Sequence, residues 1–455
     1  MRLGVRLAAM ALMAAWDAAC GSDDRDLGRV SPAEGGAADS ARDGFGVSPD
    51  GGPPLDAAAE TGDGGSAAKC EGGTTRCADG GAPLDAAAET GDGEGAAKCE
   101  GGTTRCVGNA VETCGGGGDW SAGAACSWPT PACAGGVCVA PPSCAVRAPG
   151  TSNCGASSES CCTSIEVPSG TYDRTYSFGD AGATSLADPA SVSAFRLDKY
   201  LVTVGRFRQF VSYVTGTSGA QPADGSGVQA HLNGGRGLSN SADPGTFETG
   251  WNAVGWASEI ATGPDGAGTW ECNLTACLAA STWTTAPGAQ ENLPITCVDW
   301  YEAYAFCIWD GGFLPSEAEW EYVAAGGSQQ RLYPWGSADP GTSNAYAIYG
   351  CNYDVDAGGC AGAANIAPVG AATLGGALWG QLDMAGEVFE WILDWYAPYV
   401  DPCVDCAYLT STTVRVIRGG QYGGATLNLQ AANRDFFEDP TDHDSVIGFR
   451  CARSP

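Results

Sequence analysis

The stretch PITCVDWYEAYAFCIWDGGFLPSEAEWEYVAAGG, residues 294–327, decides the fold of the largest part of this chain. Its first half predicts a helix. Asp299 stands at the N-cap position and Glu302 follows three residues later, which is the spacing of a capping box. Apolar residues then recur at helical spacing as far as Cys307. Gly311-Gly312 ends the helix, because glycine tolerates the left-handed conformation found there.

The second half of the stretch repeats the pattern. Ser316 and Glu319 have capping-box spacing, and Gly326-Gly327 stops the helix that follows them. The stretch therefore predicts two short helices that share an aromatic-rich core.

The order of residues in this stretch resembles the formylglycine-generating enzyme (sulfatase-modifying factor) family. The shared pattern is P-x-T-x-V-x-W-x-x-A-x-x-(F/Y)-C-x-W, then L-P-(S/T)-E-A-E-W-E-Y, then (F/Y)-P-W-G. Further blocks follow the family's order over roughly residues 165–455: Phe195-Arg-Leu-Asp198-Lys-Tyr200-Leu-Val-Thr203, Gly380-Gln-Leu-Asp383-Met-Ala-Gly386-Glu-Val-Phe-Glu390-Trp391, and Arg418-Gly-Gly420 with Gly448-Phe-Arg450-Cys451. The resemblance implies an α+β domain with a C-type-lectin-like fold, short sheets, few helices and much irregular chain.

The composition excludes several function classes. The chain has 455 residues, 53 of them acidic and 22 basic, for a formal net charge of −31. Nucleic acids and anionic membrane surfaces require clustered basic residues, so neither is expected as a direct partner. His231 and His443 are the only histidines, which argues against a site built from several imidazoles. The 22 cysteines indicate an oxidising compartment.

Residues 1–19 predict a secretory signal peptide. Arg2 and Arg6 give its positive start, and the apolar run that follows is too short to span a bilayer. Ala18-Ala19-Cys20 resembles a bacterial lipobox, although Asp17 replaces the aliphatic residue that the pattern prefers. We expect Cys20 to be lipidated, so that the chain contacts the membrane only through its anchor, in the cell envelope at the outer membrane or surface. Simple secretion is the alternative.

Residues 20–98 predict a disordered acidic stalk rich in glycine and alanine. They contain few large apolar side chains, so burial cannot offset the entropy cost of ordering them. The stalk contains a tandem duplication, because the segments that begin at Pro54 and Lys69 recur from Pro83 and Lys98 with a period of 29 residues. Two copies are too few for a solenoid.

Residues 99–164 predict a small module held by disulfides. Its first part contains Cys99, Cys106, Cys114, Cys126, Cys133 and Cys138, and its second part contains Cys144, Cys154, Cys161 and Cys162. Metal binding is the alternative, which the scarcity of histidine disfavours. The spacing of the cysteines does not determine their pairing.

The domain over residues 165–455 is expected to open with a strand and a helix. Residues 193–203 alternate in part like a half-buried strand, and residues 204–214 carry apolar side chains at helical spacing. Residues 215–290 are polar and rich in glycine, with scattered tryptophans. A region this long and irregular is expected to wrap a core or to build a site.

The family resemblance also implies where a copper site would lie. These enzymes bind copper through two closely spaced cysteines shortly after an R-G-G-S-(Y/F) motif, and they oxidise a cysteine of a sulfatase to formylglycine. In this chain Gln421 replaces the serine, and Gly423 with Leu427 or a neighbour stands where the cysteines belong. Glycine and leucine cannot replace thiolates as ligands of a soft copper ion. Copper is therefore not expected to bind, and no catalytic residue is assigned.

The nine cysteines of the domain leave one without an obvious partner. The resemblance implies a structural disulfide between Cys307 and Cys451, worth about 4–5 kcal/mol in the chain-entropy model. Local spacing favours three more pairs, Cys272 with Cys277, Cys351 with Cys360, and Cys403 with Cys406. Cys297 then remains as a possible free thiol, with a buried, inert state as the expected outcome.

The resemblance further implies a structural calcium ion. Gly386-Glu387-Val-Phe-Glu390-Trp391 resembles the family's G-N-x-x-E-W calcium segment, with Glu387 in place of asparagine. Glu387 and Glu390 are the expected ligands, since calcium accepts an irregular set of hard oxygen atoms. Asn344 and Asp354 are candidates for a second site. Hydrogen-bonded turn carboxylates are the alternative.

The sequence therefore predicts a surface lipoprotein whose sulfatase-modifying type domain is a non-catalytic binding or scaffold module for an extracellular peptide, protein or glycan. The main alternative is an oxidoreductase of the same type with a divergent site, either a copper-independent oxidase or an enzyme that uses Cys297. A hydrolase with paired carboxylates from Asp394, Asp401 or Asp435 is weakly supported, because nothing fixes their separation.

Overall fold

The two central helices begin and end where the sequence predicts. In the computed structural model α4 (Trp300–Trp309) is capped by Asp299 and α5 (Glu317–Ala324) by Ser316, and both capping boxes are formed. Gly311 follows α4 with φ +84, and a Cβ at this position would lie 2.7 Å from the backbone nitrogen of Ala132. Both the backbone conformation and the close approach therefore require glycine.

The structure describes residues 99–107, 110–121, 123–134, 136–179, 182–217, 221–256, 258–260, 270–275, 277, 281–354, 360, 362–434 and 436–455. The predicted signal peptide, Cys20 and the duplicated stalk lie outside the described residues. Within the described ranges, no helix combines the length and the apolar character needed to cross a membrane.

The remaining helices are short. α2 (Val204–Gly216) begins at Thr203, whose side chain accepts a hydrogen bond from the backbone of Arg206, and it buries Val204, Phe207, Phe210 and Val214. This confirms the helix predicted from the apolar spacing. The other helical elements are α3 (Trp270–Thr275) and the 3-10 turns η1 (Pro142–Cys144), η3 (Ala289–Asn292), η4 (Gly327–Gln329), η5 (Ala363–Asn365) and η6 (Thr426–Leu429).

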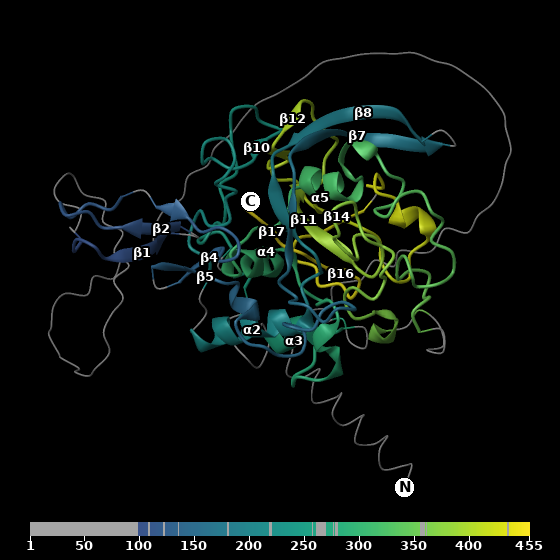
Figure 1. Cartoon of the computed structure of the whole chain (residues 1–455), viewed down its shortest axis with the longest axis horizontal. Coiled ribbons are helices and arrows are strands. Elements are labelled where there is room, and N and C mark those ends of the chain that lie inside the picture. Colours follow the sequence, from purple (N-terminus) through teal and green to yellow (C-terminus); the bar gives the residue numbers. More distant parts are fainter. Residues whose placement is uncertain are drawn as a thin grey trace, which may run out of the picture. The chain divides into compact units, whose positions relative to one another are not determined.

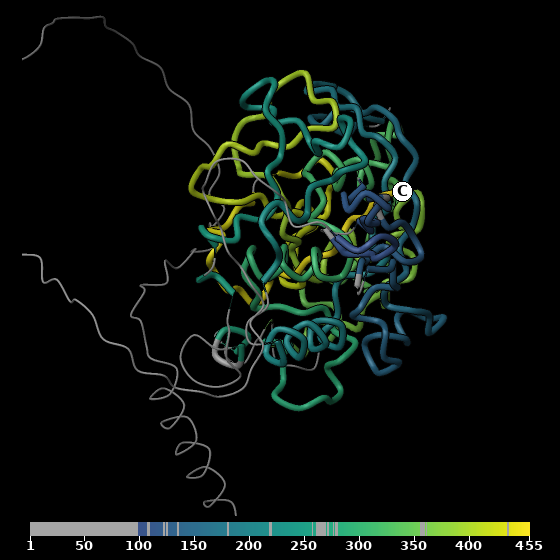
Figure 2. The backbone as a smooth tube through the Cα atoms, turned by 90° about the vertical axis from the view of Figure 1, so that its left-hand side faces the viewer, coloured from purple at the N-terminus to yellow at the C-terminus, as the bar shows by residue number. Residues whose placement is uncertain are grey.

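The strands of the domain lie in small sheets, and Figure 1 shows α2 and α3 together at one edge of the domain, away from these sheets. A four-stranded sheet has the order β15 (Phe437–Glu438), β14 (Arg415–Arg418), β11 (Phe389–Trp395) and β16 (Ile447–Gly448). Three-stranded sheets are formed by β12 (Cys403–Val404), β8 (Gly182–Val192) and β7 (Gly170–Gly179), and by β17 (Ala452–Arg453), β9 (Phe195–Asp198) and β6 (Ser164–Val167). β10 (Ser239–Asn240) pairs with β13 (Cys406–Ala407). Figure 2, which draws the backbone as a plain tube, shows that it winds irregularly over much of its course.

The strand predicted over residues 193–203 is shorter in the structure. β9 spans only Phe195–Asp198, and it pairs on one side with β6 and on the other with the C-terminal strand β17. The strand cannot continue to residue 203, because Thr203 is already the N-cap of α2. The residues between β9 and Thr203 therefore form a turn. The beginning and the end of the domain therefore lie side by side.

The long region before α4 wraps the core, as expected. Its described part contains only β10, α3 and η3, while Trp251, Trp270 and Trp283 are buried. Trp251 and Trp270 belong to the same apolar core as α2, α4 and α5. The irregular chain is therefore held by its large aromatic side chains rather than by regular hydrogen bonding.

The cysteine-rich module forms its own disulfides. Its pairs are Cys99–Cys114, Cys106–Cys133, Cys126–Cys138, Cys144–Cys162 and Cys154–Cys161. It contains β1 (Thr104–Val107), β2 (Ala110–Thr113), β3 (Ala124–Ala125), β4 (Ala132–Ala134) and β5 (Val137–Val139). All ten cysteines of residues 99–164 are thus paired within this segment.

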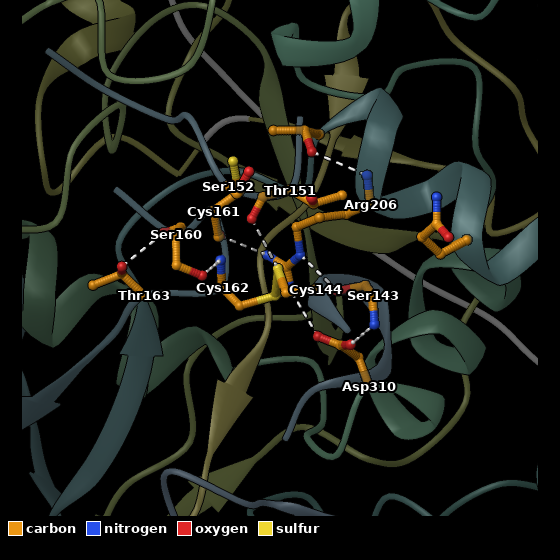
Figure 3. Close-up of a disulfide and its surroundings, with 12 residues drawn as sticks. Ser143, Cys144, Thr151, Ser152, Ser160, Cys161, Cys162, Thr163, Arg206 and Asp310 are labelled. Atoms are coloured by element: carbon orange, nitrogen blue, oxygen red, sulfur yellow. Dashed lines mark hydrogen bonds and ion pairs between the residues drawn. A yellow bond between two sulfur atoms is a disulfide. The ribbon is translucent and has the colours of Figure 1, made fainter. Parts of the chain in front are cut away.

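A buried ion network joins this module to the core (Figure 3). Arg206 binds Asp198 at 3.1 Å and Asp310 at 2.6 Å, and Arg453 binds the same two carboxylates at 3.0 and 2.8 Å. All four side chains are fully buried. The backbone of Ser143, beside the Cys144–Cys162 disulfide, donates to Asp310 at 2.9 Å. Burial alone would raise the pKa of Asp310, but the two guanidinium groups lower it below its usual value.

Candidate functional site

The Arg-Gly-Gly segment holds no cysteine of its own, but a disulfide lies beside it. The backbone nitrogen of Cys351 donates to the carbonyl of Tyr422 at 2.8 Å. A Cβ at Gly423 would lie 3.6 Å from the Sγ of Cys360, which is bonded to Cys351. The side chain of Gln421 turns back to accept a hydrogen bond from the backbone of Gly423 at 2.6 Å. The segment thus meets a cysteine pair contributed by another loop, which the sequence did not indicate.

The arginine of this segment has a structural role. Arg418 is fully buried and binds Glu321 at 2.8 Å, and it donates hydrogen bonds to two backbone carbonyls, those of Ala431 and Asn433. Burial raises the pKa of Glu321 to about 7, although Arg418 opposes this shift. Arg418 therefore ties β14 to α5 and to the chain that follows η6.

The expected calcium ligands have different environments. Glu390 is buried and its two carboxylate oxygens accept from Arg450 at 2.6 and 3.0 Å, so the arginine already occupies them. Glu387 is 1% exposed, and neither of its carboxylate oxygens has a hydrogen-bond partner of good geometry. Burial, with Asp383 nearby, raises the pKa of Glu387 well above its usual value. Glu387 has the carboxylate that is less engaged by protein donors, while Arg450 takes one lone pair of each oxygen of Glu390.

The candidates for a second calcium site lie in the loop before the Cys351–Cys360 disulfide and within it. Asn344 is exposed and Asp354 is half-buried. In the part of the chain that the structure describes, only Asp299, Glu302 and His443 form a group of three or more acidic, histidine or cysteine ligands with converging atoms. Asn344 and Asp354 thus gain no support from the geometry.

The disulfides of the domain correct one expectation. Cys307 and Cys451 are joined, as the resemblance implies, and the local pairs Cys351–Cys360 and Cys403–Cys406 are formed. Cys297, however, is bonded to Cys277 and is not a free thiol. Their Cα atoms are 6.0 Å apart, within the range that a disulfide spans. The expected Cys272–Cys277 pair is therefore wrong, and an enzyme that uses a Cys297 thiol loses its nucleophile.

The carboxylates proposed for a hydrolase serve the structure. Asp394 is buried and accepts from the backbone nitrogens of Glu317 and Tyr408 at 2.8 and 2.7 Å. Asp401 is exposed and pairs with Arg174 at 2.9 Å. Asp435 lies outside the described residues. The geometry gives no support to a paired-carboxylate mechanism.

A cavity of about 320 Å³ lies between α4, β11, β14 and the loop after β10. We call it the aromatic pocket, because its lining includes Phe247, Trp256, Trp300, Tyr304 and Trp395, together with Glu248 and Arg415. The sequence marked tryptophans in this region but did not bring them together. The three tryptophans of the lining come from three separate segments of the chain, so only the tertiary structure reveals the pocket.

Arg415 is the unusual residue of the aromatic pocket. It is 3% exposed, and its guanidinium carbon lies 3.6 Å from the ring centres of both Trp300 and Trp395. Its Nη1 donates to the carbonyl of Leu393 at 2.6 Å, and its Nε has no hydrogen-bond partner. Among the described residues no carboxylate forms an ion pair with it, and burial lowers its pKa to about 9. The pocket therefore contains a cation that two indole rings hold in place, and Asp394 interacts with it through space without forming an ion pair.

Glu248 closes the other side of the pocket. Its carboxylate accepts from the backbone nitrogens of Gln229 at 2.9 Å and Leu238 at 2.7 Å. Burial raises its pKa to about 8, against the effect of these two hydrogen bonds. The pocket thus offers aromatic surface, one guanidinium and one carboxyl group that is largely protonated at neutral pH.

Comparison with known proteins gives a consistent result. The model of the sulfatase-modifying factor enzyme 1-like domain matches residues 152–455. The chain is 36% identical to the formylglycine-generating enzyme of Mus musculus over 169 residues, which cover 36% of this chain and 45% of the mouse protein. It is 29% identical to the formylglycine-generating enzyme of Thermomonospora curvata over 311 residues, 64% of this chain and 93% of that protein. The inactive C-alpha-formylglycine-generating enzyme 2 of Mus musculus is 31% identical over 169 residues, 36% of this chain and 50% of that protein.

Proposed function

The chain belongs to the family of proteins with a sulfatase-modifying factor enzyme 1-like domain, and from that premise we propose that it is a non-catalytic binding module whose ligand occupies the aromatic pocket. The Arg-Gly-Gly segment lacks the thiolates that the resemblance assigns to copper. Family members of both kinds, a formylglycine-generating enzyme and an inactive one, are similar to this chain. A protein that keeps the fold of this family but lacks its catalytic activity is therefore compatible with the known members.

The observation that carries this proposal is the buried guanidinium of Arg415 at a cavity wall, which forms no ion pair with a carboxylate of the described residues. Removing a charge from water costs several kcal/mol, and cation–π contacts with two rings offset about 1–2 kcal/mol each. A ligand carboxylate that paired with Arg415 would supply the missing partner. The aromatic rings would stack on an apolar or sugar face of the same ligand. We therefore propose a peptide or a glycan that bears a carboxylate as the ligand.

This proposal is tested on arrays of glycans and peptides with the purified full chain. We expect saturable binding to carboxylate-bearing probes, and at least a tenfold loss of affinity in Trp395→Ala and Arg415→Gln. Tyr213→Ala is the matched control, since Tyr213 is an exposed aromatic residue on α2 and does not line the pocket. Binding that survives both pocket substitutions, or a loss that the control shares, would contradict the assignment.

An oxidoreductase of the sulfatase-modifying type is the second candidate, and one observation favours it. Cys351 and Cys360 lie beside Gly423, so their reduction would place two thiols next to the segment that lost its own cysteines. Thiolates are the ligands that monovalent copper prefers. We expect the reduced full chain to bind copper(I) with this pair if the oxidase reading holds. Equal copper binding by Cys351→Ser/Cys360→Ser and by the parent protein would remove this candidate.

We also propose that Glu387 ligates a structural calcium ion together with nearby oxygen atoms. Its buried carboxylate interacts with the backbone N–H of Ala367 but has no hydrogen bond of good geometry, and calcium would satisfy it without protonation. Calcium should raise the unfolding temperature of the full chain, and Glu387→Gln should abolish most of that increase. Glu166→Gln serves as the control, because Glu166 is an exposed carboxylate that is not among the candidate calcium ligands. An equal calcium response in both variants would refute the assignment.

The anchoring of the chain is a separate proposal. We propose that Cys20 is the lipidated first residue of the mature protein, which would tether the module to the cell envelope. Metabolic labelling with a fatty acid should mark the bacterially expressed chain, and Cys20→Ser should be unlabelled and released into the medium. Labelling that persists in Cys20→Ser would contradict the lipobox, and the absence of labelling in both would favour simple secretion.

A further inference from the structure

A cluster of one histidine and two carboxylates lies at the start of α4, outside the aromatic pocket lining. A carboxylate oxygen of Asp299, one of Glu302 and a ring nitrogen of His443 all lie within 4.8 Å of one another. Asp299 is 3% exposed and Glu302 is fully buried. Nε2 of His443 lies 3.4 Å from Oε2 of Glu302. Two ligands that are each about 2.1 Å from a tetrahedral zinc ion are separated by about 3.4 Å, so the spacing suits a shared metal.

The second nitrogen of the histidine ring is already engaged. The backbone carbonyl of Thr441 accepts a hydrogen bond from a ring N–H of His443, and this bond favours the protonated ring. Nε2 faces Oε2 of Glu302, which places the bond to Thr441 at Nδ1. Histidines that bind metals usually donate one N–H to a backbone carbonyl and direct the other nitrogen at the ion. His443 therefore has the orientation of a metal ligand, with Nε2 directed at the carboxylate of Glu302.

The carboxylates are oriented by neighbours as well. The backbone of Glu302 donates to Oδ1 of Asp299 at 2.7 Å, and the backbone of Asp299 donates to Oε2 of Glu302 at 3.2 Å. Nδ2 of Asn273 donates to the other oxygen, Oε1 of Glu302, at 3.1 Å. A carboxylate oxygen has two lone pairs, so these bonds fix the side chains and leave acceptor positions free. The arrangement has the outer support that metal ligands need.

The loop that carries His443 is fixed against the start of α4. The backbone nitrogen of Trp300 donates to the carbonyl of Pro440 at 3.0 Å, and that of Cys297 donates to Asp444 at 3.0 Å. The Sγ of Cys277, bonded to Cys297, lies 3.3 Å from the carbonyl of His443 itself. Three contacts thus hold the histidine beside the two carboxylates without help from an ion. A preformed site of this kind loses little conformational entropy when it binds a metal ion.

From this geometry we propose that Asp299, Glu302 and His443 form a binding site for a divalent transition-metal ion, with zinc as the best match. One nitrogen and two carboxylate oxygens suit zinc, and three protein ligands leave a fourth position for water or another donor. Calcium and magnesium are poorer candidates, because both prefer oxygen ligands alone. The positive end of α4 contributes only about half an elementary charge, which two carboxylates outweigh. The ion would join the start of α4 to the loop before β16.

Zinc titration of the purified full chain, freed of metal by a chelator, tests this site. We expect one equivalent to bind, with an affinity that falls at least about 100-fold in His443→Gln. Asp299→Asn should weaken zinc as well, while its amide still caps α4. His231→Gln is the matched control, because it removes the other histidine of the chain, which stacks on Phe313. No zinc binding by the parent, or equal binding by the parent and His443→Gln, would overturn the proposal in favour of a simple ion pair.

A spectroscopic measurement covers the case in which His443→Gln does not fold. Cobalt(II) added to the parent protein should give the visible absorption of a tetrahedral site, and X-ray absorption of the zinc form should show scattering from one imidazole. An octahedral cobalt spectrum without imidazole scattering would place the ion elsewhere and refute the assignment.

Discussion

Removal of the Cys307–Cys451 disulfide should destabilise the domain more than removal of any local disulfide of comparable burial. The two cysteines are separated by 144 residues, so the bond restricts a large part of the unfolded chain. In the chain-entropy model this restriction is worth about 5 kcal/mol at 25 °C. The bond Cys403–Cys406 spans a separation of 3 and is worth about 1.6 kcal/mol in the same model. We therefore expect the two losses to differ by about 3 kcal/mol.

The comparison requires two double variants, Cys307→Ala/Cys451→Ala and Cys403→Ala/Cys406→Ala. Both remove two sulfur atoms from buried positions, since all four side chains are at most 3% exposed. The cavity left behind is therefore similar, and no unpaired thiol remains to form a wrong bond. Urea unfolding followed by tryptophan fluorescence measures both free energies. Equal losses in the two variants, or a larger loss for the local pair, would refute the entropic reasoning.

Three further predictions concern buried groups. Asp310→Asn should cost about 3–5 kcal/mol in a thermal unfolding assay, because Arg206 and Arg453 would each lose a buried partner; a loss below 1 kcal/mol would contradict the network. Gly386→Ala should cost more than about 2 kcal/mol in urea unfolding, since φ is +81 and the new Cβ would lie 2.5 Å from the carbonyl oxygen of Ile348; unchanged stability would refute this. Burial raises the pKa of Glu248 to about 8 and that of Glu319 to about 7, so above about pH 4.5 the folded chain binds more protons than the unfolded chain. The free energy of unfolding should therefore fall as the pH rises toward 8. Glu248→Gln should flatten this dependence on pH, and an unchanged slope would exclude Glu248 as its source.

The features that the sequence predicted correctly depend on local interactions. The capping boxes of Asp299 and Ser316 need only residues three positions apart, and the structure contains both. The buried face of α2 follows from side-chain spacing along one helix. The strand before α2 was predicted too long, because propensity alone does not show that Thr203 is already committed to capping.

The features that the sequence missed depend on contacts between distant segments. Cys297 has its partner 20 residues upstream, across a region with little regular structure, and spacing does not reveal such a pair. His443 lies far from Asp299 in sequence, and Arg415 reaches its two indoles only when β14 packs beside α4. The family resemblance did identify the Cys307–Cys451 bond, which is also a long-range contact. The family resemblance thus predicted a long-range disulfide that local sequence patterns do not reveal.

The position of β17 in the sheet has a consequence for the synthesis of this protein. β9, near the start of the domain, has Ala452 and Arg453 as its strand neighbours on one edge, and the guanidinium of Arg453 completes the charge balance of Asp198 and Asp310. A ribosome therefore has to release residue 453 before this part of the core can close. Until then Asp198, Asp310 and Arg206 carry an unbalanced charge that resists burial. Closure of this part of the core thus waits for residues 452 and 453, and a nascent chain that still lacks them exposes an unpaired strand edge of β9 to its surroundings.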